Sequence, residues 1–81
     1  MLNGTYIGED DQDIIVFKPD GSCTISGNGL YFNGIYSKTN SGWQIELHAL
    51  GVLSATFTAK KVGNDLVISD GTGWSQRYIK Q

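Results

Sequence analysis

Cys23 and His48 are the only cysteine and the only histidine of the chain. A thiol beside an imidazole is a pair that nucleophilic catalysis can use. Cys23 alternates with Ile25 and is expected to face the interior of a sheet, whereas His48 falls on the outward face of another strand. The two side chains should therefore not meet, and a buried free cysteine most often packs as a small apolar side chain.

One cysteine excludes an internal disulfide, and one cysteine with one histidine excludes a Cys/His zinc cluster. Nowhere does the sequence bring together a nucleophile, a base and an orienting group. We therefore predict that the protein is not an enzyme and that it uses no cofactor.

Two acidic segments have residue types found in known sites. Glu9, Asp10, Asp11 and Asp13 could offer oxygen ligands to Ca²⁺, but their spacing is not that of an EF-hand loop. Residues 70–73 read Asp-Gly-Thr-Gly, which is not the order of an aspartic-protease motif, and no second copy supplies a paired carboxylate. We interpret both segments as turns.

The charge pattern argues against two classes of partner. The chain has 81 residues and a net charge of −2. No basic stripe suited to nucleic acid is visible among its six basic residues, which are spread along the sequence: Lys18, Lys38, Lys60, Lys61, Arg77 and Lys80. No run is long enough to span a membrane, and no signal peptide is expected. The length predicts one domain, residues 1–81.

Turn residues divide the chain into short strands. The strongest hairpin signal is 13–25, in which Pro19-Asp20-Gly21 separates two runs of β-branched and aromatic residues. Turn signals recur about every 8–12 residues, which is typical of all-β folds. We predict an antiparallel up-and-down meander of about eight strands that closes into a small barrel and so removes its edges: 3–8, 13–18, 22–26, 30–37, 43–49, 52–61, 66–70 and 74–80.

Period-2 alternation gives the expected interior. Leu30 and Leu53 also fall on inward faces, and Gly34 in mid-strand indicates a bulge or a sharp bend. An eight-stranded barrel is about wide enough inside for its own side chains, so a deep cavity is not expected. The main core residues should be Tyr6, Phe17, Tyr36, Trp43, Leu47, Phe57, Ile68, Trp74 and Tyr78.

Four apolar residues are expected to face outward on neighbouring strands: Ile14, Val16, Tyr31 and Ile35. An exposed apolar patch marks an interaction surface. Our main hypothesis is therefore a non-enzymatic interaction module that docks a protein partner, or forms a homo-oligomer, through this exterior patch. As the alternative, Trp43 or Trp74, near strand ends, would hold a small apolar ligand or a carbohydrate at the mouth of the barrel.

Several runs resemble a known family. Gly4–Gly8, Ile15–Cys23 and Gly34–Tyr36 resemble the Gly-x-Tyr strands and Asp-Gly turns of small lipocalin-like barrel domains in bacterial lipoproteins and surface proteins. Gly63–Ile68 and Arg77–Tyr78 are similar to the second half of those domains. The resemblance implies a meander barrel, often attached to an anchor or a partner domain, with no catalytic residue and with a bacterial cell-surface or extracytoplasmic location.

Overall fold

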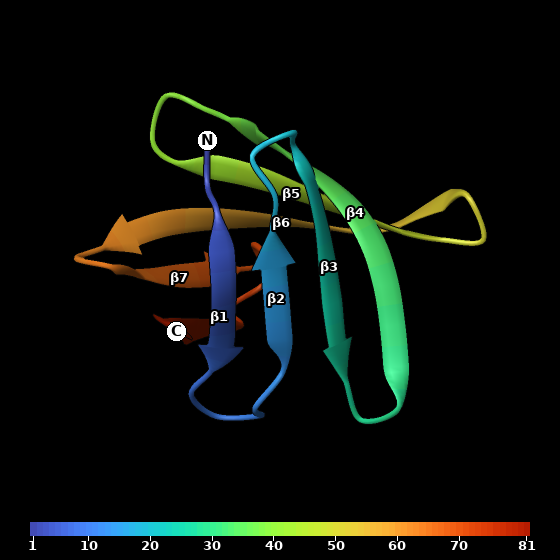
Figure 1. Cartoon of the computed structure of the whole chain (residues 1–81), viewed down its shortest axis with the longest axis horizontal. Coiled ribbons are helices and arrows are strands. Elements are labelled where there is room, and N and C mark those ends of the chain that lie inside the picture. The colour runs from blue at the N-terminus through green and yellow to red at the C-terminus, as the bar shows by residue number, and fades with distance from the viewer.

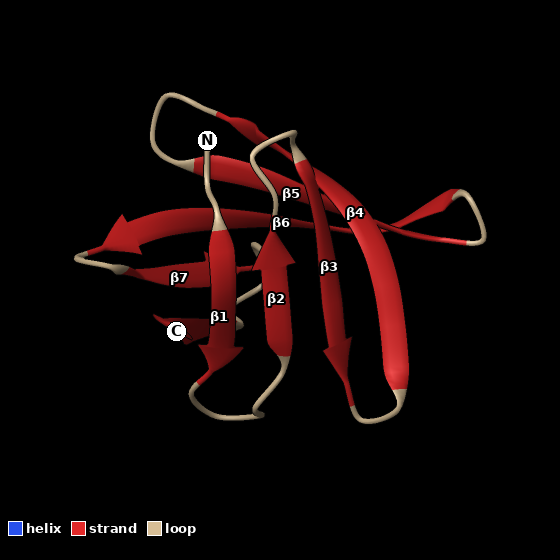
Figure 2. Cartoon of the chain, viewed as in Figure 1, coloured by secondary structure: helices blue, strands red, loops and turns tan.

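The computed structural model describes residues 1–81, and all of its regular structure is β-strand (Figures 1 and 2). Each strand pairs antiparallel with the next, and β8 pairs with β1, so that the barrel is closed. The predicted fold is confirmed. The strands are β1 (Gly4–Gly8), β2 (Ile14–Phe17), β3 (Ser22–Gly27), β4 (Leu30–Lys38), β5 (Trp43–Ala49), β6 (Val52–Val62), β7 (Asp65–Ser69) and β8 (Ser75–Lys80).

Local turn chemistry explains where the strands reverse. Asn28 and Gly29 have φ of 51° and 76°, the left-handed pair that a two-residue hairpin turn needs. The Asp70 carboxylate accepts hydrogen bonds from the Thr72 backbone N–H and hydroxyl, both at 2.8 Å. Segment 70–73 is therefore a turn, as predicted.

The long strand β4 joins two layers of the barrel. In Figure 1, β1 to β3 run nearly upright across the front, and β6 and β7 cross behind them. Gly34 in β4 pairs with Cys23 on one side and Leu47 on the other. A Cβ atom at Gly34 would lie 2.6 Å from the Glu46 carbonyl oxygen, so only glycine permits this close approach. At Gly34, where the sequence predicts a bulge or a sharp bend, the backbones of neighbouring strands therefore approach closely, and strand pairing continues on both sides.

The bulge lies instead between β5 and β6. Leu47 pairs with Ala55, but His48 pairs with Leu53, which leaves Ser54 as an extra residue. One extra residue reverses the inward and outward faces beyond it. Leu53 therefore lies on the face of His48 and is 52% exposed, so its predicted inward position is wrong.

Aromatic rings fill one half of the interior. Tyr6, Phe17, Tyr36 and Trp43 follow one another edge to face, with successive ring centroids 5.6, 5.1 and 5.8 Å apart. Such geometry favours aromatic pairs beyond their burial alone. Leu2, which was not among the predicted core residues, is buried at this end, and its carbonyl oxygen accepts a hydrogen bond from the Tyr36 hydroxyl.

Most of the predicted core is confirmed. Seven of the nine residues are buried, and Phe57 is partly buried. Trp74 is 39% exposed, so its assignment to the core is wrong. It precedes the first residue of β8 and packs against Phe57 alone among the aromatic residues, with centroids 6.0 Å apart. Leu30 is 60% exposed because the pairing of β4 with β5 begins only at Asn33.

Candidate functional site

The other half of the interior is not filled by side chains. A cavity of about 300 Å³ lies there. An adjoining hollow of about 250 Å³ shares Asp13, Ile25, Leu47 and Phe57 with it and extends between the β3–β4 turn and the β5–β6 hairpin. The walls of the cavity are eight apolar residues and three aspartates: Ile15, Ile25, Ile45, Leu47, Phe57, Ile68, Trp74, Tyr78, Asp11, Asp13 and Asp70.

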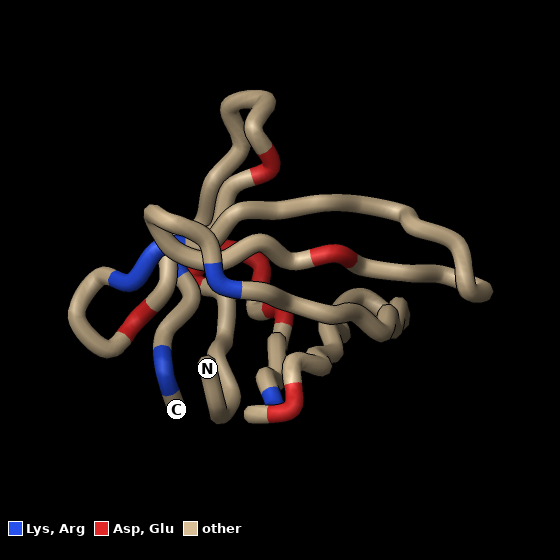
Figure 3. The backbone as a smooth tube through the Cα atoms, turned by 90° about the horizontal axis from the view of Figure 1, so that it is seen from above, with Lys and Arg blue, Asp and Glu red and all other residues tan.

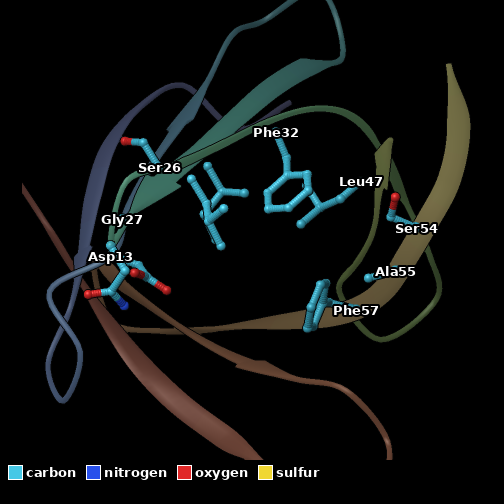
Figure 4. Close-up of a pocket in the computed structure, with 11 residues that line it drawn as sticks. Asp13, Ser26, Gly27, Phe32, Leu47, Ser54, Ala55 and Phe57 are labelled. Atoms are coloured by element: carbon cyan, nitrogen blue, oxygen red, sulfur yellow. The ribbon is translucent and has the colours of Figure 1, made fainter. Parts of the chain in front are cut away.

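Two features of the strands create this space. The inward positions here carry mainly isoleucine and leucine, where the opposite half carries aromatic rings. The wall also parts, because residues 30–32 of β4 have no partner on β5 and residues 52–57 of β6 have none on β7. In Figure 4, Phe32 and Leu47 lie on one side of the hollow, Phe57 lies opposite, and Asp13 and Gly27 lie at its far end.

Asp13 is built into this wall. It precedes Ile14 on β2 and alternates inward with Ile15, opposite Gly27. A Cβ atom at Gly27 would lie 1.9 Å from Asp13 Oδ1, so the absence of a side chain there makes room for the carboxylate. Burial and the neighbouring Asp11 carboxylate both raise the pKa of Asp13.

Asp11 and Asp70, unlike Asp13, have lowered pKa values and so ionise more readily. Burial opposes ionisation of Asp11, but hydrogen bonds outweigh it and lower the pKa, led by the bond from the Asp13 backbone N–H at 3.0 Å. Hydrogen bonds from the Thr72 backbone and hydroxyl lower the pKa of Asp70. Two carboxylates of the rim are therefore charged at neutral pH, and a ligand with a positive or donor group would match them.

Gln76 adds a second polar feature to this end of the barrel. Its Oε1 accepts hydrogen bonds from the backbone N–H groups of Asp10 and Asp11, at 2.8 and 3.0 Å, and so holds the β1–β2 turn. Its side chain is buried, and its Nε2 has no hydrogen-bond partner within the protein. Gln76 lies between Trp74 and Tyr78 in the sequence, and these two residues line the cavity, whereas Gln76 itself does not.

The chemical groups singled out in the sequence are kept apart. Cys23 is buried on the inward face of β3, and burial raises its pKa to about 11. His48 lies on the outward face of β5, so the two do not form a dyad. No group of three or more His, Cys, Asp or Glu side chains is placed to hold a metal ion.

The two tryptophans lie at opposite ends of the barrel. Trp74 borders the apolar cavity, as the ligand-binding alternative requires. Trp43 is 8% exposed and lies at the other end, beneath the Lys38 Nζ, which is 4.7 Å from the ring centroid. The sequence pattern could not separate them, because both tryptophans sit near a strand end.

The end near Trp43 is basic. A hollow of about 620 Å³ there is lined by Lys38, Lys60, Lys61 and Lys80, four of the six basic residues. Strands β4, β6 and β8 all finish at this end, and they carry these lysines in their last residues. In Figure 3 most Lys and Arg segments lie toward the side where both termini are marked. These four lysines are far apart in the sequence, and the fold brings them together at one end of the barrel.

The predicted exterior patch is present but interrupted. Ile14, Tyr31 and Ile35 are 39, 64 and 53% exposed, and Val16 is half-buried. All four face outward, as predicted. Strand β3 lies between β2 and β4, however, and its outward residues are the hydroxyl side chains Ser22, Thr24 and Ser26.

A row of isoleucines continues the patch in the other direction. Ile14 on β2 pairs with Ile7 on β1, and Ile7 pairs with Ile79 on β8. Both added residues are half-buried. Neither isoleucine was predicted to belong to the patch, because Ile79 comes beside Ile7 only through the closing contact between β1 and β8.

Comparison with family models, with curated proteins and with solved structures finds no match to this chain. The structure contains no helix long and apolar enough to cross a membrane. The classification of the chain therefore rests on its fold, a small, closed, eight-stranded antiparallel β-barrel.

Proposed function

We propose that the protein binds a small apolar molecule in the unfilled half of its barrel, with an amine or hydroxyl group of that molecule directed at the aspartates. The observation that carries this proposal is the cavity of about 300 Å³, with eight apolar wall residues and a rim of three aspartates. Ligand sites are typically concave and mostly apolar, with a few polar groups that fix orientation.

The wall composition favours an apolar ligand over a carbohydrate. A sugar needs many hydrogen-bonding partners, whereas the polar side chains of this wall are three carboxylates and one tyrosine hydroxyl. Phe57 and Trp74 pack together at the mouth and would cover an apolar guest. Removing apolar surface from water is worth about 25 cal/mol per Å².

The polar groups give the ligand its orientation. Ionised Asp11 and Asp70 favour a positive or hydrogen-bond-donating group. Burial, with Asp11 and Asp13 nearby, raises the pKa of Tyr78, so its hydroxyl stays protonated.

The resemblance seen in the sequence supports the same proposal. Eight-stranded barrels can hold one small ligand in their interior, and the chain resembles the lipocalin-like barrels of bacterial lipoproteins and surface proteins. A non-enzymatic carrier or sensor module at a bacterial cell surface is therefore part of this proposal.

The test uses three probes that share one tail: hexylamine, hexanol and hexanoate, titrated by calorimetry. We expect affinity to fall in that order, because the rim repels the carboxylate. Ile25→Phe should weaken hexylamine binding at least tenfold by filling the cavity. The matched control Ile35→Phe adds the same ring outside, where the side chain is 53% exposed, and should leave binding unchanged. Absence of binding by all three probes, or unchanged binding by Ile25→Phe, would contradict the proposal.

A second candidate function is docking of a protein partner on the barrel exterior through Ile14, Val16, Tyr31 and Ile35. The high exposure of Tyr31 and Ile35 favours it. Combined Ile14→Lys and Tyr31→Lys substitutions should abolish capture of a partner, and any self-association through this face, measured by sedimentation. Unchanged capture and sedimentation would exclude this surface.

A further inference from the structure

Strand β6 extends beyond the end of its neighbour β7, so part of its edge has no paired strand. Its residues 52–57 pair with β5, but its pairing with β7 begins only at Thr58. None of the backbone hydrogen bonds outside the strand pairings involves residues 52–57. This six-residue edge is therefore unpaired, although the strand order closes into a barrel. In Figure 1 the β5–β6 hairpin projects beyond β4, and the view in Figure 3 shows the same projection from above.

This edge has little of the protection that natural edges carry. Free edges are usually blunted by charged side chains, prolines or bulges. Segment 49–59 reads Ala-Leu-Gly-Val-Leu-Ser-Ala-Thr-Phe-Thr-Ala, with no charge and no proline, and the bulge at Ser54 is its one irregularity. A segment of this composition is suited to pairing with another strand.

The tip of the β5–β6 hairpin exposes apolar side chains to water and contains an unfavourable backbone conformation. Leu50 is fully exposed, and it adopts φ of 54° in a turn position that favours asparagine or glycine. Val52 and Leu53 are 67 and 52% exposed. Three large apolar side chains in four residues, one of them on left-handed backbone, indicate a surface that is covered when the protein functions.

We propose that two copies of this chain pair through the free edges of β6, antiparallel and about a twofold axis. A twofold axis joins the same surface of both copies, so each edge satisfies the other. Residues 52–57 are the longest free edge of the barrel, so they are also the edge that a second copy offers. Because segment 49–59 has no charge, the pairing brings no like charges together.

The geometry of such a pairing is specific. An axis between Ser54 and Ala55 places Val52 opposite Phe57 and Leu53 opposite Thr56, and apolar or β-branched pairs of this kind stabilise antiparallel strands. Alternate residues of an antiparallel strand turn their N–H and C=O groups to the free side. About three residues of each copy would therefore exchange backbone hydrogen bonds. The inference rests on the free edge and not on ligand binding, although Ser54, Ala55 and Phe57 of this edge also line the hollow beside the cavity.

The test is sedimentation equilibrium over a range of protein concentrations, with hydrogen exchange on the same samples. We expect a dimer, and amides within 52–57 that become protected as the dimer forms. Thr56→Lys places a charge on the exposed edge and should weaken dimerisation at least tenfold. Thr24→Lys is the control, because β3 is paired on both sides at Thr24.

Leu53→Lys is a second edge variant, in case Thr56→Lys disturbs folding, since Leu53 is already half-exposed. A monomer at every concentration, or a dimer that both edge variants leave intact, would overturn the proposal. Open-ended assemblies in place of a dimer would also overturn it, because a twofold pairing uses both edges and stops at two copies.

Discussion

The two tryptophans show that a residue's role here follows from its position. Trp43 begins β5 and is the last of four aromatic side chains that pack edge to face inside the barrel. Trp74 follows a turn, precedes β8 and stays partly exposed at the mouth of the cavity. We therefore assign Trp43 to stability and Trp74 to the proposed site.

Trp43→Ala should lower the free energy of unfolding by about 3–5 kcal/mol, the usual cost of deleting a buried large aromatic side chain. Trp74→Ala should lower it by less than about 1 kcal/mol, because that ring is partly exposed. Urea unfolding of the two variants measures both values. Equal losses would show that the two rings do not differ in this way.

Cys23 should be unreactive toward thiol reagents in the folded protein. Burial raises its pKa to about 11, and the reactive form of cysteine is the thiolate. At pH 8 we expect negligible labelling by a thiol reagent under native conditions and complete labelling in urea. Rapid labelling of the native protein would contradict the position of Cys23 in the core.

Individual strands were predicted where the sequence alternates cleanly. β5 spans the predicted residues 43–49, with its inward and outward faces as expected. The prediction for Leu53 on β6 was wrong, because the apolar–polar alternation of the sequence continues unchanged through the bulge. The extra residue is defined only by pairing with β5, and no single-strand pattern contains that information.

Asp65, the first residue of β7, links this strand to β8, because its carboxylate accepts from the Lys80 backbone N–H at 3.0 Å and from the Arg77 guanidinium at 2.8 Å. These two bonds, the backbone one first, hold the pKa of Asp65 below its usual value. A carboxyl group with a lowered folded-state pKa stabilises the fold fully above its unfolded pKa of about 4. That stabilisation is lost as pH falls through the folded-state pKa.

Asp65→Asn should therefore unfold more easily than the unaltered protein at pH 7, and the difference should shrink as pH falls below about 4. Thermal unfolding across this pH range provides the measurement. A difference that stays constant with pH would show that ionised Asp65 does not contribute in this way.

At the scale of the whole molecule, closing the barrel determines features that the sequence pattern does not contain. Four lysines far apart in the chain meet at one end, and Asp11, Asp13 and Asp70 meet around the cavity at the other. Trp74 was identified as a candidate site residue from the sequence, but the aspartate rim was not.

One signal for that rim was present in the sequence. Asp13 alternates with Ile15 and with Phe17, a predicted core residue, and this pattern would have placed its carboxylate inside. The cavity itself follows from where β4 and β6 lose their neighbours. That depends on pairing between strands, so composition and periodicity could not predict it.

The most direct test of apolar ligand binding is a methyl NMR titration with hexylamine, because the eight isoleucines provide their own control. Four line the cavity, Ile15, Ile25, Ile45 and Ile68, and four lie on the barrel exterior, Ile7, Ile14, Ile35 and Ile79. We predict saturable shifts, and contacts to the ligand tail, at the four interior methyl groups alone. Shifts confined to the exterior isoleucines, or none at saturating ligand, would contradict the proposed function.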